Sequence, residues 1–188
     1  MLICLIRTRL FYPGAKIIRF PFDIRNSKNI KLGKGFTAGR LCRFEVAVEA
    51  AKTNKICIEI GENVRVGDFV HITALDSIKI GNGCGIGPKT LISDLNHGNF
   101  DENVEYDITI PYAQRSLSSK PVVIGNDVWI GESVCILPGV TIGDGAIIGA
   151  LSNVTKSIPA YSMAVGNPAK VIKVYNFKTK CWERTNSK

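Results

Sequence analysis

The stretch VVIGNDVWIGESVCILPGVTIGDGAIIGALSNV (122–154) repeats itself with a period of six residues. An aliphatic residue recurs at every sixth position, and a second aliphatic or small residue stands two positions before it. The first series is Ile124, Ile130, Ile136, Ile142, Ile148 and Val154, and the second is Val122, Val128, Val134, Val140, Ala146 and Ser152. An amphipathic helix needs spacings of three and four residues, so this period excludes one.

A period of six is typical of short strands whose alternate residues point inward and which turn a corner every six residues. Three such strands close one triangular coil of about eighteen residues, and stacked coils form a solenoid. The N-terminal half carries the same pattern at Ile60, Val66 and Ile72 and, two residues out of step, at Ile80, Ile86 and Ile92. The sequence therefore predicts an all-β fold, a parallel β-solenoid.

The composition is that of one globular domain. The chain has 188 residues, of which 45% are hydrophobic and 21% charged, which excludes a disordered or fibrous protein. No apolar run reaches the ~18 residues of a membrane-spanning helix. The six cysteines are scattered without a CxxC pair, so we expect neither a zinc site nor disulfides. The opening MLICLI is too short for a signal peptide, so we expect a cytoplasmic protein.

Positive charge gathers at both ends of the chain. Residues 1–34 hold eight Lys and Arg against Asp23 alone, and residues 156–188 hold seven against Glu183. The basic residues are not interleaved with aromatic ones on one platform, so we expect no nucleic-acid partner. The basic ends could contact anionic phospholipids or the phosphates of a ligand, or they could be solvated termini.

The run IGNDVWIGESVCILPGVTIGDGAIIGALSNVTKSIPAYSMAVGNPAKVIK (124–173) closely resembles the hexapeptide-repeat acyltransferases. It is most similar to the galactoside, maltose and xenobiotic O-acetyltransferase branch, and nearest to bacterial surface-polysaccharide O-acetyltransferases. The resemblance implies a left-handed parallel β-helix over residues 30–175, an N-terminal extension at 1–29 and a C-terminal tail at 176–188. It also implies a homotrimer with the active sites between adjacent subunits.

The activity implied by the resemblance is transfer of an acetyl group from acetyl-CoA to a sugar hydroxyl, in lipopolysaccharide or exopolysaccharide biosynthesis. No metal is implied. An antibiotic-inactivating acetyltransferase and a non-catalytic β-helix scaffold stay open as alternatives. The γ-type carbonic anhydrases share the fold but hold zinc with three histidines, and this chain has only His71 and His97.

The six-residue period fails over SDLNHGNFDENVEYDITIPYAQRSLSSKP (93–121), a polar and turn-rich segment. A long structureless insertion in a regular solenoid is more often functional than accidental. In the family that the chain resembles, the matching loop projects toward a neighbouring subunit and carries the catalytic histidine near its start. His97, in the motif Asp94-Leu95-Asn96-His97-Gly98, matches that histidine, and Asp94 is assigned with it to the acceptor site. The alternative for His97 is a surface histidine without a role.

Two outward-facing residues are further candidates. His71 stands between inward Val70 and Ile72, at a position where sugar acetyltransferases carry an Asn that binds the acceptor; the alternative is a solvent or interface histidine. Trp129 alternates with inward neighbours and matches a tryptophan that lines the groove where acceptor and thioester arm meet. The alternative for Trp129 is packing against the long loop.

Several positions align with family residues that contact coenzyme A: Gly131, Ala150, Thr155, Lys156, Lys170 and Lys173. Small residues let the pantetheine arm lie along the coil wall, and Thr155 and the lysines can meet its phosphates. The chain departs from the family at Glu132, where Ser or Ala is common. It also departs at the last two basic positions, where lysines replace the usual arginines and offer no bidentate fork. For these two lysines the alternative is a solvated tail.

The N-terminal segment 1–20 alternates apolar residues with Arg7, Arg9, Lys16 and Arg19. A basic amphipathic segment can lie in a membrane interface, so peripheral contact with the inner face of the membrane is one interpretation. The other is a helix that caps the first coil.

Overall fold

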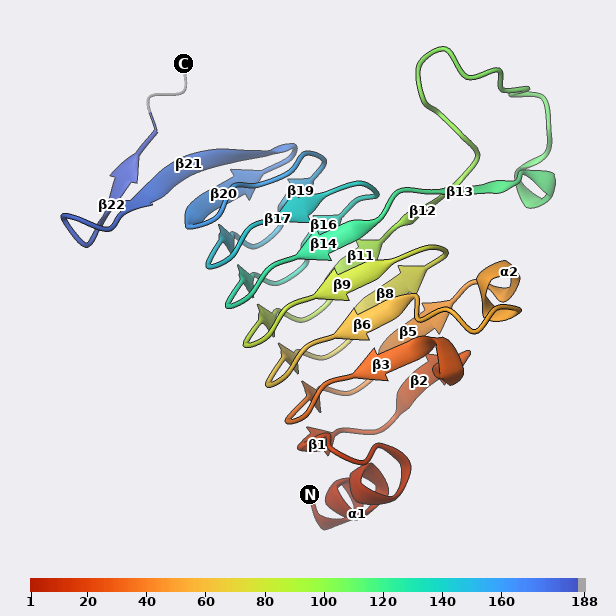
Figure 1. Ribbon diagram of the computed structural model, residues 1–188, viewed down its shortest axis with the longest axis horizontal. Coiled ribbons are helices and arrows are strands. Elements are labelled where there is room, and N and C mark those ends of the chain that lie inside the picture. The colour runs from red at the N-terminus through yellow and green to blue at the C-terminus, as the bar shows by residue number, and fades with distance from the viewer. Residues whose placement is uncertain (186–188) are drawn as a thin grey trace.

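The computed structural model describes residues 1–185, whose strands stack coil upon coil around one interior (Figure 1). Sheet A consists of β1 (Ile17–Ile18), β4 (Thr37–Ala38), β7 (Arg65–Val66), β10 (Gly85–Ile86), β15 (Trp129–Ile130), β18 (Ile147–Ile148), β20 (Ser162–Gly166), β21 (Ala169–Asn176) and β22 (Cys181–Arg184). Sheet B consists of β2 (Phe22–Arg25), β5 (Cys42–Val46), β8 (His71–Ala74), β11 (Leu91–Ser93), β16 (Cys135–Ile136) and β19 (Asn153–Val154). Sheet C consists of β3 (Ile30–Leu32), β6 (Ile58–Ile60), β9 (Ile78–Ile80), β14 (Val122–Ile124) and β17 (Thr141–Ile142).

The remaining elements lie at the edges of this solenoid. They are the helices α1 (Leu2–Phe11) and α2 (Val48–Ala51), the 3-10 turns η1 (Ser27–Asn29) and η2 (Tyr112–Gln114), and the antiparallel pair β12 (Leu95–His97) and β13 (Leu117–Ser119).

The interior is filled by the residues of the six-residue pattern, as predicted. Every residue of the two series in 122–154 is buried, and so are the corresponding residues of the N-terminal half. Each strand pairs in parallel with the strand one coil away, so that Ile60 lies opposite Ile80 and Ile86 opposite Ile130. Burying an aliphatic side chain contributes about 1.5–3 kcal/mol, and this column is therefore the main source of stability. The predicted all-β, parallel architecture is confirmed.

Every insertion into the coils falls at the corner between sheet B and sheet C. Helix α2 follows β5, an enlarged corner at 75–77 follows β8, and the pair β12–β13 follows β11. Figure 1 shows α2 and the β12–β13 pair on the same edge of the solenoid. The corner at 75–77 accounts for the two-residue shift of the pattern between Ile72 and Ile80. The solenoid thus keeps its register and places its irregular segments along one edge.

The ends of the segment 93–121 form a hairpin, where the sequence had predicted an irregular loop throughout. His97 lies opposite Leu117 in an antiparallel register, and the Lys120 amide donates to the Asp94 carbonyl oxygen at 2.8 Å. Figure 1 shows this hairpin leaving the stack and ending in an open loop. The antiparallel ladder fixes the direction in which the insertion projects.

The paired strands begin before residue 30, the expected start of the solenoid. Ile17 and Ile18 pair with β4, and β2 pairs with β5, so residues 17–25 already belong to the stack. Helix α1 then covers the first coil: the Ile18 amide donates to Thr8 Oγ1 at 2.9 Å, and Thr8 is fully buried. The interpretation of the N-terminal segment as a capping helix is therefore confirmed.

The C-terminal end of the stack is closed by antiparallel strands. Strand β21 folds back on β20, and β22, which lies in the segment assigned to the tail, pairs with β21. An open coil end would expose unpaired strand edges; β21 pairs with the edge of β20, and its Ala169 and Val171 pack against the core. Residues 186–188 lie outside the described residues. Within the described residues, no helix is long and apolar enough to span a bilayer.

The corners that join sheet C to sheet A stack so closely that a side chain fits only where the next coil leaves room. A Cβ on Gly81 would lie 2.6 Å from the backbone carbonyl of Gly125, whereas one on Gly85 would meet nothing closer than Trp129 Cδ1 at 3.8 Å. We predict that Gly81→Ala lowers the free energy of unfolding by about 1–3 kcal/mol, as overpacking does. The matched variant Gly85→Ala should be neutral or slightly stabilising. Urea unfolding of both variants checks this, and equal midpoints would contradict the stacking argument.

Candidate active site

His97 lies at the end of β12, and its imidazole is exposed on the projecting hairpin. Its Nε2 atom is 3.1 Å from the Tyr112 hydroxyl, and the two ring centroids are 4.6 Å apart. The phenolic hydroxyl of Tyr112 therefore occupies the hydrogen-bonding position at this ring nitrogen. Sequence reasoning missed Tyr112, because the irregular segment between His97 and η2 gives no spacing from which their contact could be predicted.

Asp94, which was assigned to the acceptor site, is fully buried at the base of the hairpin. Its Oδ1 atom accepts a hydrogen bond from the Leu75 amide at 2.7 Å, and Oδ2 accepts from Asp76 at 2.8 Å and Ser77 at 2.6 Å. Burial raises the pKa of the carboxyl above its ordinary value, and the three N–H donors oppose that rise. The side chain therefore ties down the enlarged corner at 75–77, and its assignment to the acceptor stays a prediction.

His71 points outward from β8, as predicted, and belongs to a charged cluster on sheet B. Its Nε2 atom is 2.9 Å from Glu45 Oε1, while Glu45 Oε2 accepts from the Arg43 guanidinium. A second arginine, Arg25, approaches the same carboxylate at 3.6 Å. Burial raises the pKa of Glu45, but hydrogen bonds from His71 and Arg43 outweigh it and hold the pKa below its ordinary value. An ionised Glu45 thus fixes the orientation of the His71 ring.

Trp129 points outward from sheet A, and its side chain is 61% exposed. On that face Trp129 lies opposite Ile147, and Ile147 lies opposite Met163 on the next strand. Met163 in turn pairs with Lys173 in the β20–β21 ladder, so Trp129 and Lys173 lie in one row. A bulge between Met163 and Ala164 shifts the register, and beyond it Lys170 pairs with Val165. Trp129 and the two lysines therefore share one face of the solenoid.

The other predicted cofactor residues occupy two different corners. Gly131 and Ala150 stack directly at the corner after sheet A, where a Cβ on Gly131 would lie 2.6 Å from the Ala150 nitrogen. Thr155 and Lys156 are exposed and follow β19, at the corner after sheet B. The predicted site residues thus form three groups in one chain: the hairpin with His97, sheet B and its following corner, and sheet A with its following corner.

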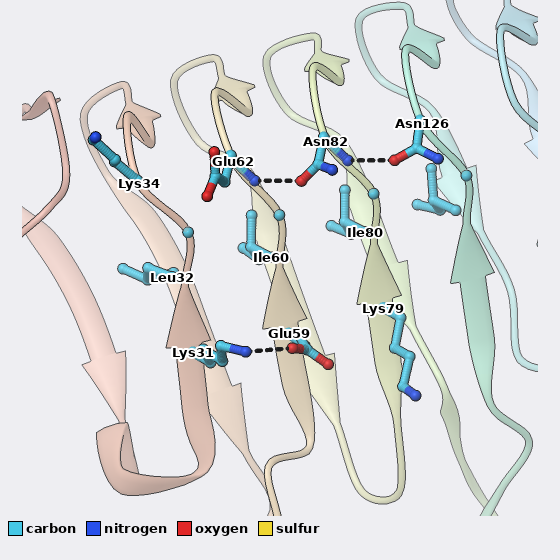
Figure 2. Close-up of a pocket in the computed structure, with 15 residues that line it drawn as sticks. Lys31, Leu32, Lys34, Glu59, Ile60, Glu62, Lys79, Ile80, Asn82 and Asn126 are labelled. Carbon is cyan, nitrogen blue, oxygen red and sulfur yellow. Dashed lines mark hydrogen bonds and ion pairs between the residues drawn. The ribbon is translucent and has the colours of Figure 1, made fainter.

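An open groove lies elsewhere, on sheet C (Figure 2). It has a volume of about 530 Å³, and none of the predicted site residues lines it. Lys31 pairs there with Glu59 at 2.8 Å, and the Asn82 amide donates to Asn126 Oδ1 at 2.9 Å. Figure 2 shows that these contacts bridge successive coils. The groove therefore results from the stacking of the corners. Its asparagine side chains accept hydrogen bonds from backbone N–H groups of the neighbouring corners.

Metal-binding residues do not gather in the described part of the chain: no group of three or more His, Cys, Asp or Glu side chains could hold an ion there. The cysteines are free thiols. Burial raises the pKa of Cys42 and Cys84, which keeps these two thiols protonated at neutral pH.

The role found for Asp94 yields a stability prediction. Asp94→Asn keeps one acceptor oxygen but turns an amide N–H₂ group toward backbone donors, so we predict a loss of about 2–4 kcal/mol in the free energy of unfolding. The exposed Asp101→Asn, which loses only a surface ion pair with Lys120, should cost less than about 1 kcal/mol. Chemical unfolding of the two variants measures the difference, and a fully stable Asp94→Asn protein would refute the structural role.

Comparison with known proteins connects this geometry to a family. The model of the bacterial transferase hexapeptide (six repeats) matches residues 121–156. WbbJ of Escherichia coli (strain K12), named "Putative lipopolysaccharide biosynthesis O-acetyl transferase", is 43% identical over 178 residues, which cover 94% of this chain and 88% of WbbJ.

Two solved structures share the fold. A hexapeptide-repeat acetyltransferase from Vibrio cholerae O1 biovar eltor, complexed with acetyl coenzyme A, superposes with a TM-score of 0.61 at 25% identity and covers 80% of this chain and 74% of its own. AntD is an N-acyltransferase from Bacillus cereus, solved in complex with dTDP and 3-hydroxybutyryl-CoA. It superposes with a TM-score of 0.70 at 22% identity, and the alignment covers 92% of this chain and 90% of AntD. The chain therefore belongs to the bacterial hexapeptide-repeat transferase family, and it is an acyltransferase.

Proposed function

We propose that the protein is an acetyl-CoA-dependent O-acetyltransferase that acetylates a sugar hydroxyl during lipopolysaccharide or exopolysaccharide biosynthesis. The observation that carries the proposal is the exposed imidazole of His97 on the projecting hairpin, whose Nε2 atom already has a hydroxyl group, the Tyr112 phenol, at 3.1 Å. The likeness to WbbJ over nearly the whole chain supports a surface-polysaccharide acceptor. A xenobiotic acceptor has less support, because no feature of the described chain favours it.

In this mechanism His97 acts as the general base. An alcohol is a weak nucleophile at neutral pH, and removal of its proton during attack lowers the barrier. The imidazole takes the proton from the sugar hydroxyl as that oxygen forms a bond to the thioester carbonyl carbon. The carbon–sulfur bond then breaks, and the imidazolium returns the proton to the departing sulfur. The products are the acetyl ester and coenzyme A, and Tyr112 gives up its place beside Nε2 to the acceptor.

The donor would lie against sheet A. Trp129 offers an exposed aromatic wall for the thioester arm, and the stacked corner formed by Gly131 and Ala150 follows it along the coil. Lys170 and Lys173 extend that face and form no ion pair among the described residues, so they can meet phosphates. The residues present therefore fit a phosphate-bearing thioester.

The acceptor would contact the cluster on sheet B. Glu45 binds Nε2 of His71, which leaves the Nδ1 atom of the ring for a sugar hydroxyl. Arg43 holds the second oxygen of the same carboxylate, so the ring cannot swing without breaking a charged network. We assign His71 to the acceptor and Glu45 to its orientation.

A complete site requires more than one chain. Trp129 and His71 belong to different faces of the solenoid. Thr155 and Lys156 lie at a different corner from Gly131. The hairpin that carries His97 extends away from the stack (Figure 1). We infer that left-handed coils assemble as a homotrimer, so that the His97 hairpin of one subunit closes the donor and acceptor faces of the next. We also assign the enzyme to the cytoplasmic side of the membrane.

The trimer has a direct test. Multi-angle light scattering at micromolar concentration should give three times the chain mass of 20.5 kDa. A stable monomer at that concentration would contradict both the trimer and the shared site.

For catalysis, we predict that His97→Ala lowers kcat by about 10²–10⁴, the usual value of general-base assistance. Affinity for coenzyme A and the mass of the assembly should stay unchanged, because the imidazole is exposed on the hairpin. Release of free thiol from acetyl-CoA, with nucleotide sugars, free glycans and lipid-linked oligosaccharides as acceptors, measures the rate. If the variant keeps more than about a third of kcat while chemistry limits turnover, His97 is not the base.

A matched variant of His71 distinguishes the role of general base, assigned to His97, from the role of acceptor binding, assigned to His71. His71→Ala and Glu45→Gln should both raise the KM for the acceptor while changing kcat less than His97→Ala does, since they alter binding of the sugar and its orientation. A larger loss of kcat in His71→Ala than in His97→Ala would exchange the two roles.

A further inference from the structure

Helix α1 has two unlike sides. Its inner side is held to the first coil by Thr8, which is buried and bonded to Ile18. Its outer side carries an apolar stripe at the spacing i, i+3, i+7, formed by Ile3, Ile6 and Leu10. These side chains are 72%, 51% and 71% exposed. Apolar side chains exposed side by side on one face of a helix are typical of a contact surface.

The charge around the stripe has one sign. By helical spacing Arg7 and Arg9 lie at its two margins, and Lys16 and Arg19 are exposed directly before and after β1. No ion pair of the described residues engages any of these four cations. The first acidic residue of the chain is Asp23, which pairs with Arg25. A partner that fits this surface must offer negative charge around an apolar centre. A bilayer of anionic lipids offers negative headgroups and apolar acyl chains together over a wide area, so we favour it over a protein partner.

The surroundings of the helix are apolar as well. Two open grooves of about 300 and 420 Å³ flank Phe11 and Tyr12, and the second is lined by Arg7, Phe20 and Phe22. The Arg7 guanidinium carbon lies 4.4 Å from the centre of the Phe20 ring, which holds the cation at the edge of this groove. Phe11, between the two grooves, is itself 65% exposed. Aromatic rings beside cations at the edge of an apolar surface suit the boundary between acyl chains and headgroups.

From these observations we propose that α1 is an interfacial helix that docks the protein on an anionic lipid bilayer, with the stripe Ile3, Ile6 and Leu10 in the acyl boundary and the cations at the headgroups. Figure 1 shows α1 at one end of the stack and the closing strands β21 and β22 at the other. The helix can therefore cap the first coil with one face and contact a membrane with the opposite face.

Docking at this end also defines how far the acceptor must extend, a consequence that rests on the proposed function. The order β2-β5-β8-β11 separates the first coil from the base of the hairpin by three ladder steps. Each step is about 4.8 Å, so the hairpin leaves the stack roughly 15 Å from the first coil. A glycan anchored in the bilayer by a lipid would present sugars at that height.

The test is sedimentation of the full chain with vesicles. We expect binding to vesicles of phosphatidylglycerol and phosphatidylethanolamine, weak binding to phosphatidylcholine, and loss of binding in high salt. Arg9→Glu with Lys16→Glu should weaken binding to anionic vesicles about 10- to 30-fold or more, and Ile6→Ser with Leu10→Ser should weaken it for every lipid. Lys178→Glu with Lys180→Glu makes the same charge change at the far end and should bind normally. Thermal unfolding verifies that each variant is folded.

Three results would overturn the proposal: no binding to anionic vesicles, equal binding by all variants, or a smaller assembly in Ile6→Ser with Leu10→Ser without any change in vesicle binding. The last result would identify the stripe as a contact between copies of the chain. His97→Ala should bind vesicles as the unaltered chain does, so failure of the catalytic assignment is distinguishable from failure of this proposal.

Discussion

The interior of the solenoid is narrow, and this limits where every other side chain can lie. Each short strand points one aliphatic side chain inward, and successive coils place these side chains directly above one another. The corners stack so closely that a Cβ on Gly81 would lie within 2.6 Å of the next backbone. Neither the interior nor these corners can carry chemistry. Functional side chains are therefore expected at outward strand positions, at open corners such as the one with Thr155 and Lys156, and in segments inserted at the one edge that tolerates them.

Asp94 shows how the fold and the site are joined at that edge. Its carboxylate binds three backbone amides of the enlarged corner below it, while its own carbonyl accepts from Lys120 on the returning strand. One buried residue thus fixes both the corner and the base of the hairpin, and His97 follows three residues later. Asp94 acts through position, whereas His97 is free to meet a substrate.

The regular part of the molecule was predictable because its signal is local and repeated. The period identified the inward residues, and alternation alone predicted that Trp129 and His71 point outward. Contacts that cross insertions were not predictable. Glu45 meets His71 because β5 pairs with β8, but the insertion that contains α2 makes the sequence offset between these strands irregular. Tyr112 meets His97 only through the conformation of the loop. The start of the stack was placed too late, since Ile17 and Ile18 form only one short strand before the pattern becomes regular.

In the proposed assembly, the hairpin of one subunit completes the site of another. Co-expression of His97→Ala with Trp129→Ala, each of which we expect to have little activity alone, tests this arrangement. A mixed assembly should recover acetyl transfer well above either parent, because an intact His97 from one chain meets an intact Trp129 on its neighbour. If mixed assemblies form and stay as inactive as the parents, both residues serve the site of a single chain, and the shared-site account is contradicted.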